Sequence, residues 1–351
     1  SCPCALVVSV PLSFFAGIGS ASRQGILIKG SNYLEMLDKA NVFVFDKTGT
    51  LTKGNFAVTA IEPESNKDEV LRLAAIAEHD SNHPIARSIV SCYQGEIESG
   101  YTLTNVAGFG ILATKGDDVI YCGNEKLMKS YDIKYVKQNG VGTVVYVAKN
   151  DKFIGSLLIS DEIKPESKQA ISELNAMGAK TVMLTGDNEV IAASVAQEIG
   201  LSDYKASLLP QNKVEHVEQL LSEKKKGDVL CFVGDGINDA PVLMRSDIGI
   251  AMGGVGSDAA IEASDVVLMQ DDLKGISTAK RIAKKTMRVV YENIVGSLAV
   301  KILIMALSAT GVLGAYSMWI AVVGDVGVAI AAILNAMRVN KGTKTTVKLE
   351  K

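Results

Sequence analysis

The chain has 351 residues, a net charge of −3 at pH 7 and 48% hydrophobic residues. This length suffices for about two or three domains, and the slightly acidic balance argues against a nucleic-acid-binding protein, which would be basic. The five cysteines form one Cys-Pro-Cys pair and three single residues. This is not the pattern of a disulfide framework, so we expect the globular part in a reducing, cytosolic environment.

Three apolar zones predict membrane helices. Residues 5–18 are too few to span a bilayer, which takes about 20 residues, and are interpreted as the second half of a spanning helix. Residues 294–314 and 318–336 are each close to spanning length and apolar on all faces, which disfavours a buried hairpin of a soluble protein. Basic residues flank the outer ends of this pair and place those ends in the cytosol: Lys284, Lys285, Arg288, Arg338, Lys341, Lys344 and Lys348.

Between these zones, short apolar runs alternate with helical patterns. The runs cover residues 42–45, 181–184, 229–233 and 248–251, and the helical patterns cover 165–177, 189–199 and 211–223. This alternation predicts a doubly wound parallel α/β sheet. Residues 55–160 interrupt it with helices near 68–78 and 84–91 and strands near 101–106, 119–121, 143–148 and 153–158. We therefore expect an α+β domain inserted just after the first strand of the sheet.

The run at 42–45 ends in Asp46-Lys47-Thr48-Gly49-Thr50. The reactive site of an open parallel sheet lies at the carboxyl ends of its strands, so Asp46 is placed as a nucleophile. The turn behind it offers backbone N–H groups for phosphate oxygens. A carboxylate can attack a γ-phosphoryl group and form an acyl phosphate. Alone, however, a strand-end Asp is more often a turn cap.

Three further segments favour phosphoryl transfer. Thr185-Gly186-Asp187 offers hydroxyl and N–H groups to a phosphoryl group, and Lys213 offers a cation for the charge that develops. Asp235 could complete a magnesium site with Asp46, since Mg²⁺ prefers one or two carboxylates with phosphate oxygens and waters. The chain has no Gly-x-x-x-x-Gly-Lys-Ser/Thr motif, so it is not a P-loop enzyme.

In this order the motifs resemble those of the P-type ATPases over the whole chain: residues 46–52 (DKTGTLT), 185–187 (TGD) and 234–239 (GDGIND). The resemblance implies a haloacid-dehalogenase-like phosphorylation domain in which ATP phosphorylates Asp46. It also implies that Asp235 and the Thr48 carbonyl bind magnesium. The remaining residues that it assigns to phosphoryl contact or to bracing the site are Lys47, Thr185, Gly186, Asp187, Lys213, Asn238 and Asp239.

The inserted domain carries a second set of candidate residues. Glu78 precedes His83-Pro84 on a predicted helical hairpin, and two glycine turns follow at residues 108–111 and 123–124. A lone Gly-x-Gly is a weak signal, and a single His is more often structural. Together they resemble the adenine-nucleotide pocket of the heavy-metal ATPases. This implies that Glu78 and His83 orient ATP and that glycines let it approach the backbone, at a site made of Glu78, His83, Gly108, Gly110, Gly123 and Asn124.

The membrane residues address the cargo. Cys2 and Cys4 flank a proline, which unwinds a helix locally, and thiolates select soft metals. Lys301 and Asp325 lie inside apolar stretches, where each charge costs roughly 2.5–3.5 kcal/mol, so a functional role is favoured. Asp325 could complete a Cys-Cys-Asp shell suited to tetrahedral zinc, and Lys301 could pair with it as a counterion once the metal has left.

The positions of Asn293, Lys301 and Asp325-Val326-Gly327 resemble the zinc-, cadmium- and lead-exporting subgroup. This implies an ATP-driven exporter in the plasma or inner membrane, embedded in the lipid bilayer, with cytosolic globular domains. We expect residues 1–40 to hold a half-helix and its connection, 41–54 and 161–288 the phosphorylation domain, 55–160 the nucleotide-binding domain, 289–340 two membrane helices and 341–351 a tail. Since Thr-Gly-Glu is absent, we expect an actuator domain, with further helices, before Cys2 in a longer protein.

Three alternatives remain open. The first is a copper(I) or potassium pump, against which Lys301 and Asp325 weigh. The second is a soluble haloacid-dehalogenase-type phosphatase. Such enzymes usually carry an Asp two residues after the nucleophile, where this chain has Thr48, which suits a long-lived phosphoenzyme. The third is a module that binds nucleotide and metal without turnover.

Overall fold

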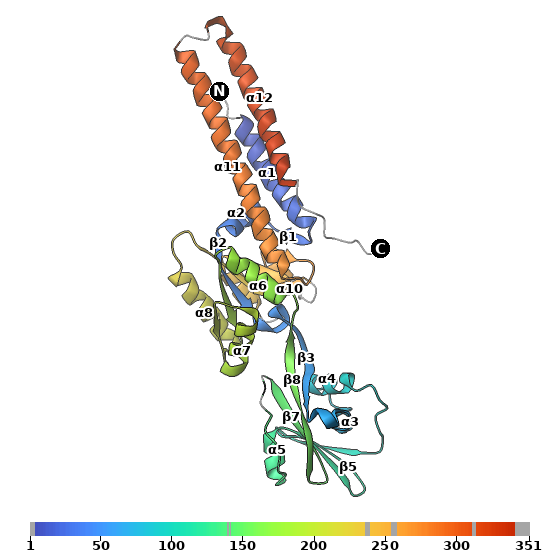
Figure 1. Cartoon of the computed structure of the whole chain (residues 1–351). Coiled ribbons are helices and arrows are strands. Elements are labelled where there is room, and N and C mark those ends of the chain that lie inside the picture. The colour runs from blue at the N-terminus through green and yellow to red at the C-terminus, as the bar shows by residue number, and fades with distance from the viewer. Residues whose placement is uncertain are drawn as a thin grey trace. The chain divides into compact units, whose positions relative to one another are not determined.

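The computed structural model describes residues 4–138, 140, 142–235, 239–253, 258–310 and 314–340. The chain divides into two compact units (Figure 1). The larger unit comprises Ser1–Thr50, Pro165–Gly186 and Ala196–Lys351, and the smaller one Leu51–Lys164 and Asp187–Val195. The expected limits of the insertion, 54/55 and 160/161, therefore lie inside two strands of the smaller unit, β3 (Thr52–Glu62) and β8 (Lys152–Ile163).

A seven-stranded sheet forms the centre of the larger unit. Every pair of neighbours is parallel except β1 with β13, which confirms the predicted α/β class. The central strands are buried on both faces, which is why they are continuous apolar runs. In spatial order the strands are β1 (Ile26–Ile28), β13 (Val266–Leu268), β12 (Ile248–Met252), β11 (Val229–Gly234), β2 (Ala40–Asp46), β9 (Lys180–Leu184) and β10 (Asp203–Lys205).

Short amphipathic helices cover this sheet. Val217 of α8 and Leu243 of α9 pack against Val44, Val182 and Phe232 of the central strands in one hydrophobic cluster. The helices of this part of the chain are α2 (Ser31–Lys39), α6 (Ser167–Ala176), α8 (Pro210–Glu223), α9 (Ala240–Arg245) and α10 (Asp258–Ala263). The helix α7 (Glu189–Ile199) is divided between the two units, which meet in the chain after Val195.

The prediction that the insertion follows the first strand of the sheet is wrong, because β1 precedes β2. This strand has only three residues, too few for a periodic pattern, and pairs antiparallel with β13 at the sheet edge. Ile26 and Ile28 are buried and Leu27 is exposed. The segment between the first membrane helix and β2 is thus built of β1 and α2, whose Leu34 and Leu37 are fully buried.

The smaller unit is an antiparallel sheet with helices on both faces. On one face, Leu73 and Ile76 of α3 pack against Ile120, Val147 and Leu157. On the other face, α5 packs through Leu127 and Met128. The predicted helices and four strands are present, whereas β3, β5 and α5 were not predicted. The elements are β3, β8, β7 (Thr143–Lys149), β6 (Asp118–Gly123), β5 (Gly110–Lys115) and β4 (Thr102–Val106) in spatial order, with α3 (Lys67–Glu78), α4 (Pro84–Cys92) and α5 (Glu125–Ser130).

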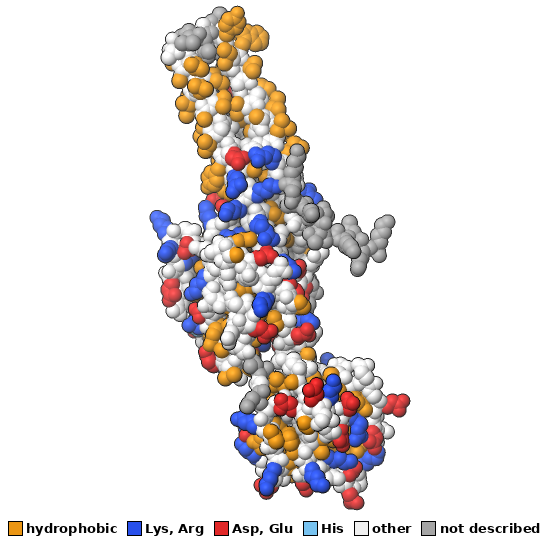
Figure 2. Space-filling view, in the orientation of Figure 1, with side chains coloured by type: hydrophobic (Ala, Val, Ile, Leu, Met, Phe, Trp, Pro, Cys, Tyr) orange, Lys and Arg blue, Asp and Glu red, His pale blue; other side chains and the backbone are white. Residues whose placement is uncertain are grey.

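Three helices of the described chain are long and apolar enough to cross a membrane: α1 (Cys4–Ser22), α11 (Lys274–Ala309) and α12 (Ser317–Met337). They lie side by side in the larger unit (Figure 1). Hydrophobic side chains cover the end of the bundle that lies far from the sheet, and Lys and Arg gather at the end near the sheet (Figure 2). The helix α11 begins at Lys274, well before the apolar zone at 294, so it reaches from the sheet-bearing part into the bundle.

Polar contacts hold α11 to its neighbours. Near the sheet, Glu173 of α6 pairs with Arg281 at 3.0 Å and accepts a hydrogen bond from Ser277 at 2.5 Å. In the bundle, the amide of Asn293 donates to the Ala332 carbonyl at 3.1 Å. Hydrogen bonds between helices are worth about 0.6–2 kcal/mol in a membrane, so these contacts specify how the helices pack.

Candidate functional site

The nucleophile candidate Asp46 ends strand β2 and is followed by a tight turn. Thr48 (φ −75°, ψ 128°) and Gly49 (φ 74°, ψ −15°) have the dihedral angles of a type II β-turn, whose third position requires positive φ and therefore favours glycine. A Cβ at Gly49 would collide with the carboxylate of Asp235, which follows β11. The end of β11 thus lies directly against the turn after Asp46.

Three charged side chains meet beside this turn. Nζ of Lys213 lies 2.5 Å from Oδ1 of Asp46 and 3.0 Å from Oδ1 of Asp239. Lys213 stands in the first turn of α8. There the Asn212 side chain accepts a hydrogen bond from the Leu209 N–H at 3.2 Å, which fixes the backbone at the start of the helix. Asp46 is 5% exposed and Asp239, the N-cap residue of α9, is 2% exposed. One partly buried cation therefore pairs with two buried carboxylates.

This cluster perturbs the acid–base properties of its members. Burial, followed by the negative charge of Asp239, raises the pKa of Asp46 to about 7, and the Lys213 cation limits the rise. Burial lowers the pKa of Lys213, but the carboxylates of Asp46 and Asp239 outweigh it, so the pKa of Lys213 is raised and the ammonium persists. The site thus holds a carboxylate that titrates near neutral pH beside a permanent cation.

We predict that Asp46→Asn increases fold stability progressively more as the pH rises from about 4 to 7. In that window Asp46 is ionised in the unfolded chain but largely protonated in the folded protein. The stability of the wild type therefore falls as the pH rises towards the folded-state pKa of about 7. The variant lacks this loss, which approaches ~1 kcal/mol per pH unit at most. Thermal unfolding at pH 4, 5, 6, 7 and 8 measures the difference. A difference that does not change with pH would contradict the assignment.

Among the other predicted phosphoryl-binding residues, Thr185 lies at the same sheet edge. Asp46 is in register with Leu184, so Thr185 stands one residue beyond it on the neighbouring strand. Thr185 is buried, and its backbone bonds to Lys205 and Leu208 tether the segment before α8. Lys47 is buried, Gly186 is exposed, and Asp187 is assigned by its contacts to the smaller unit. Asn238 lies outside the described residues.

The residues proposed to hold magnesium fit a hard cation. Asp235 lies against the turn and its charge contributes to the raised pKa of Asp46, so both carboxylates share one small space. With the Thr48 carbonyl they form an all-oxygen set, and Mg²⁺ usually takes one or two carboxylates and completes its shell with phosphate oxygens and waters. Across the described residues, no group of three or more His, Cys, Asp and Glu is arranged to hold a metal.

In the smaller unit, most of the proposed nucleotide residues gather around the ends of β5 and β6. Gly110 and Gly123 are in register on these strands. Asn124 caps α5, and its Nδ2 donates to the Gly108 carbonyl at 2.8 Å, which ties the two glycine turns together. Glu78, at the end of α3, accepts a 3.7 Å hydrogen bond from the Cys122 thiol, and burial raises the pKa of Glu78.

His83 has a structural contact of its own. It is the N-cap residue of α4, and its Nδ1 accepts a hydrogen bond from the Ile85 N–H at 3.3 Å. The ring is otherwise exposed at the surface of the smaller unit. Its part in binding nucleotide stays a prediction, as does that of the glycines and of Glu78.

We predict that Gly110→Ala lowers the free energy of unfolding of the smaller unit by more than about 2 kcal/mol. Gly110 has φ +150°, and a Cβ there would collide with backbone atoms of Cys122 and Gly123. Gly108→Ala is the matched control, because its φ is +76° but nothing lies within 4 Å of its Cβ. Its free energy of unfolding should fall only by about 1 kcal/mol, the cost of a left-handed backbone conformation for alanine. Equal losses, measured by chemical denaturation, would contradict the packing argument.

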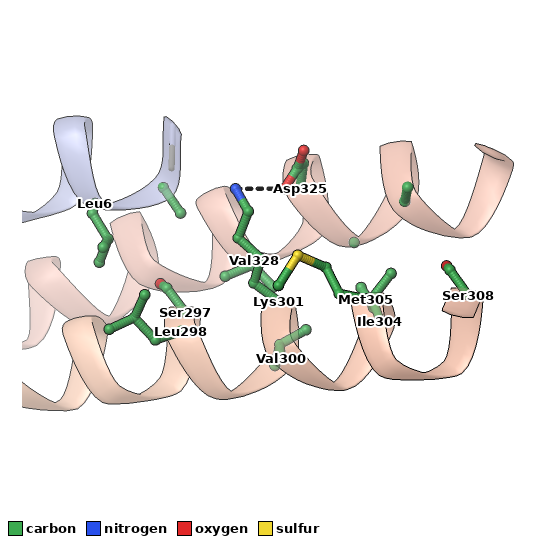
Figure 3. Close-up of a pocket in the computed structure, with 13 residues that line it drawn as sticks. Leu6, Ser297, Leu298, Val300, Lys301, Ile304, Met305, Ser308, Asp325 and Val328 are labelled. Atoms are coloured by element: carbon green, nitrogen blue, oxygen red, sulfur yellow. Dashed lines mark ion pairs between the residues drawn. The ribbon is translucent and has the colours of Figure 1, made fainter. Parts of the chain in front are cut away.

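The charged membrane residues meet across the helix pair. Lys301 of α11 and Asp325 of α12 form an ion pair at 3.9 Å (Figure 3). They line a cavity of about 240 Å³ together with Ala5 and Leu6 of α1. These two residues follow Cys4, whose side chain is not described, and Cys2 lies outside the described residues. The start of α1 is thus brought to the ion pair, while the thiolate ligands themselves stay a prediction.

Among the other residues that line this cavity, three carry a hydroxyl or a thioether and were not singled out by sequence reasoning: Ser297, Met305 and Ser308. All three stand on α11 at spacings of three or four residues, on the face that carries Lys301. That spacing was the available signal. The spacing did not single out these residues, because serine and methionine are common in apolar helices.

Comparisons with known proteins agree with this geometry. The model of the haloacid dehalogenase-like hydrolase family matches residues 40–247. The chain is 49% identical over 347 residues to the cadmium, zinc and cobalt-transporting ATPase of Bacillus subtilis and 50% identical over 346 residues to the zinc-transporting ATPase of a Synechocystis species. Both matches cover 97% of this chain but 49% and 47% of the relatives, so the chain spans about half their length.

Solved structures give the same picture. A zinc-transporting PIB-type ATPase in its E2.Pi state superposes with a TM-score of 0.85 at 36% identity, covering 97% of this chain and 56% of the other. The catalytic domain of a CPx-ATPase matches 75% of this chain with a TM-score of 0.58 at 28% identity. The relatives and solved structures that the chain resembles are metal-transporting ATPases, and the chain itself belongs to the haloacid dehalogenase-like hydrolase family.

Proposed function

We propose that this chain carries the catalytic and cargo-binding parts of an ATP-driven pump that exports soft divalent metal ions, namely zinc, cadmium or lead. The observation that carries the proposal is the buried cluster of Asp46, Lys213 and Asp239, in the same compact unit as three helices long enough to cross a membrane. The names of the relatives, which transport zinc, cadmium or cobalt, support the cargo class. Those helices also disfavour a soluble phosphatase.

In the proposed reaction, a carboxylate oxygen of Asp46 attacks the γ-phosphorus of ATP. The bond from the γ-phosphorus to its bridging oxygen breaks, and ADP leaves with that oxygen and its electron pair. Lys213 keeps part of Asp46 ionised near neutral pH and stabilises the charge that develops on the phosphoryl oxygens, with help from Thr185. Magnesium, held by Asp46, Asp235 and the Thr48 carbonyl, would supply further neutralisation of phosphate charge.

The cargo site is proposed at the cavity beside Lys301 and Asp325. A soft divalent ion would bind the thiolates of Cys2 and Cys4 and the carboxylate of Asp325, and Lys301 would pair with Asp325 after release. The 3.9 Å ion pair and the position of Ala5 in the same cavity support this assignment. The lipid bilayer surrounds these helices, and a preceding part with an actuator domain would hydrolyse the phosphoenzyme.

The helix α11 offers a route for coupling the two sites. Nζ of Lys280, in its first half, donates to the backbone oxygen of Ala40, the residue that starts β2. The strand β2 ends in Asp46, and the other half of α11 carries Lys301. Phosphorylation at one end of β2 would therefore act on a helix that is hydrogen-bonded to its other end.

Phosphoenzyme formation on the complete protein in detergent tests this function. Labelled magnesium-ATP is supplied with zinc, cadmium, lead or copper(I) in turn. An acid-stable, hydroxylamine-labile label that appears only with the divalent ions is the expected result. A label that appears only with copper(I) would overturn the cargo, and no label on folded, ATP-bound protein would overturn the pump.

A further inference from the structure

Ser297 is a buried hydroxyl with an unusual environment. Its side chain lies on α11 with 9% of the residue exposed, and its Oγ has no hydrogen-bond partner among the described residues. Hydroxyls in helices commonly bond back to the carbonyl four residues earlier. In this protein Ser13 and Thr286 do so at 2.8 Å each. A buried hydroxyl without a partner costs free energy, which points to a partner in another state of the protein.

The position of Ser297 identifies that partner. Ser297 lines the same cavity as Lys301 and Asp325 (Figure 3). It stands four residues before Lys301, one helical turn away on the same face. Helical side chains lean towards the N-terminus, so the Lys301 side chain extends over the turn that carries Ser297. At 3.9 Å the Lys301–Asp325 ion pair is longer than a direct hydrogen bond.

Three other side chains of α11 are less suited to the Lys301 ammonium. Asn293, two turns before Lys301, is already engaged, because its amide donates to Ala332 and its oxygen accepts from Asn335 at 3.0 Å. The Met305 thioether is a weak acceptor. Ser308 follows Lys301 and is exposed, on the side away from the lean of the lysine. Of these side chains, Ser297 alone combines burial, a good acceptor and the right direction.

We propose that Ser297 is a positioning residue whose hydroxyl accepts a hydrogen bond from the Lys301 ammonium when the transported metal ion occupies Asp325. This rests on the proposed function, in which the metal ion displaces Lys301 from Asp325. A displaced ammonium inside a membrane is costly unless a polar group receives it. Ser297 thus exchanges with Asp325 as the partner of Lys301, and the exchange makes metal binding more favourable.

Equilibrium dialysis of the complete protein with zinc tests the exchange. The relevant quantity is the affinity of the zinc site that Asp325→Asn abolishes. Ser297→Ala is expected to weaken this site about tenfold, the size of one hydrogen bond to a charged group. Ser297→Thr keeps the hydroxyl and should stay within about twofold of the wild type. Thr310→Ala is the matched control and should leave the affinity unchanged, because it removes an exposed hydroxyl at the end of the same helix, outside the cavity lining.

The Lys301→Met background separates positioning from direct ligation. If Ser297 acts through the ammonium, Ser297→Ala has no further effect on zinc affinity once Lys301 is absent. A tenfold loss that persists in this background would make Ser297 a metal ligand and overturn the proposal. Wild-type affinity in Ser297→Ala, or a failure of Ser297→Thr to restore it, would overturn it as well. If Asp325→Asn removes no zinc site, the proposed cargo site fails, a result distinct from those three.

Discussion

Asp46→Asn is expected to abolish the phosphoenzyme formed from labelled ATP and to reduce metal-stimulated ATP hydrolysis roughly 10⁴-fold. An amide cannot form an acyl phosphate, and every other part of the site acts on the phosphoryl group that Asp46 receives. The variant should still fold, since Asn preserves the shape of the side chain and an oxygen that accepts from Lys213. Acid-quenched labelling of the complete protein with saturating zinc measures the loss.

Asp228→Asn is the matched control for this experiment. Asp228 precedes β11, so it lies at the opposite end of that strand from Asp235 and the phosphorylation site. Its side chain accepts a hydrogen bond from the Lys225 N–H in a surface turn at 3.2 Å. Labelling of this variant should equal that of the wild type. Metal-stimulated hydrolysis retained by Asp46→Asn would show that another residue is the nucleophile.

Lys213→Met is expected to slow phosphorylation about 10²- to 10³-fold, the usual effect of losing one group that stabilises the charge of a transition state. A second effect acts on the nucleophile. The Lys213 cation limits the rise in the pKa of Asp46, so its removal raises that pKa above about 7 and leaves less carboxylate at neutral pH. The residual rate of the variant should therefore continue to increase at pH values where the wild-type rate has levelled off.

Single-turnover phosphorylation at pH 6, 7, 8 and 9 measures both effects. Lys226→Met is the matched control, because Lys226 is an exposed lysine that follows the other end of α8. It should keep the wild-type rate and pH profile. A Lys213→Met rate within about threefold of the wild type across this range would remove Lys213 from the reaction.

Much of the larger unit follows from local patterns. Strands β2, β9, β11 and β12 are buried on both faces, so their sequences are unbroken apolar runs that end in Asp, Gly or Thr, and both features can be recognised without a structure. Strand β1 could not be found in this way. It is three residues long, and its place at the sheet edge depends on pairing with β13, more than 200 residues later.

The positions of the residues proposed for phosphorylation were predictable for the same reason. Parallel strands place their carboxyl ends at one edge, so motifs far apart in the chain meet once the strand order is assumed. The contact of Lys213 with Asp239, in contrast, depends on how α8 and α9 pack over the sheet. Ser297 shows the same limit in the membrane part, because its missing partner and its burial exist only in the packed bundle.

By itself, the sequence determined the α/β class, the apolar helices, the family and the place of Asp46 at the end of a strand, since these depend on composition, periodicity and motif order along one chain. Only the tertiary structure decided that Lys213 is shared by Asp46 and Asp239, that Asp235 lies against the turn at Gly49, and that Ser297 faces the cavity of Lys301 and Asp325. Each of these results depends on distances between side chains from separate elements. Such distances are set by how helices and strands pack, and no local pattern in the chain encodes them.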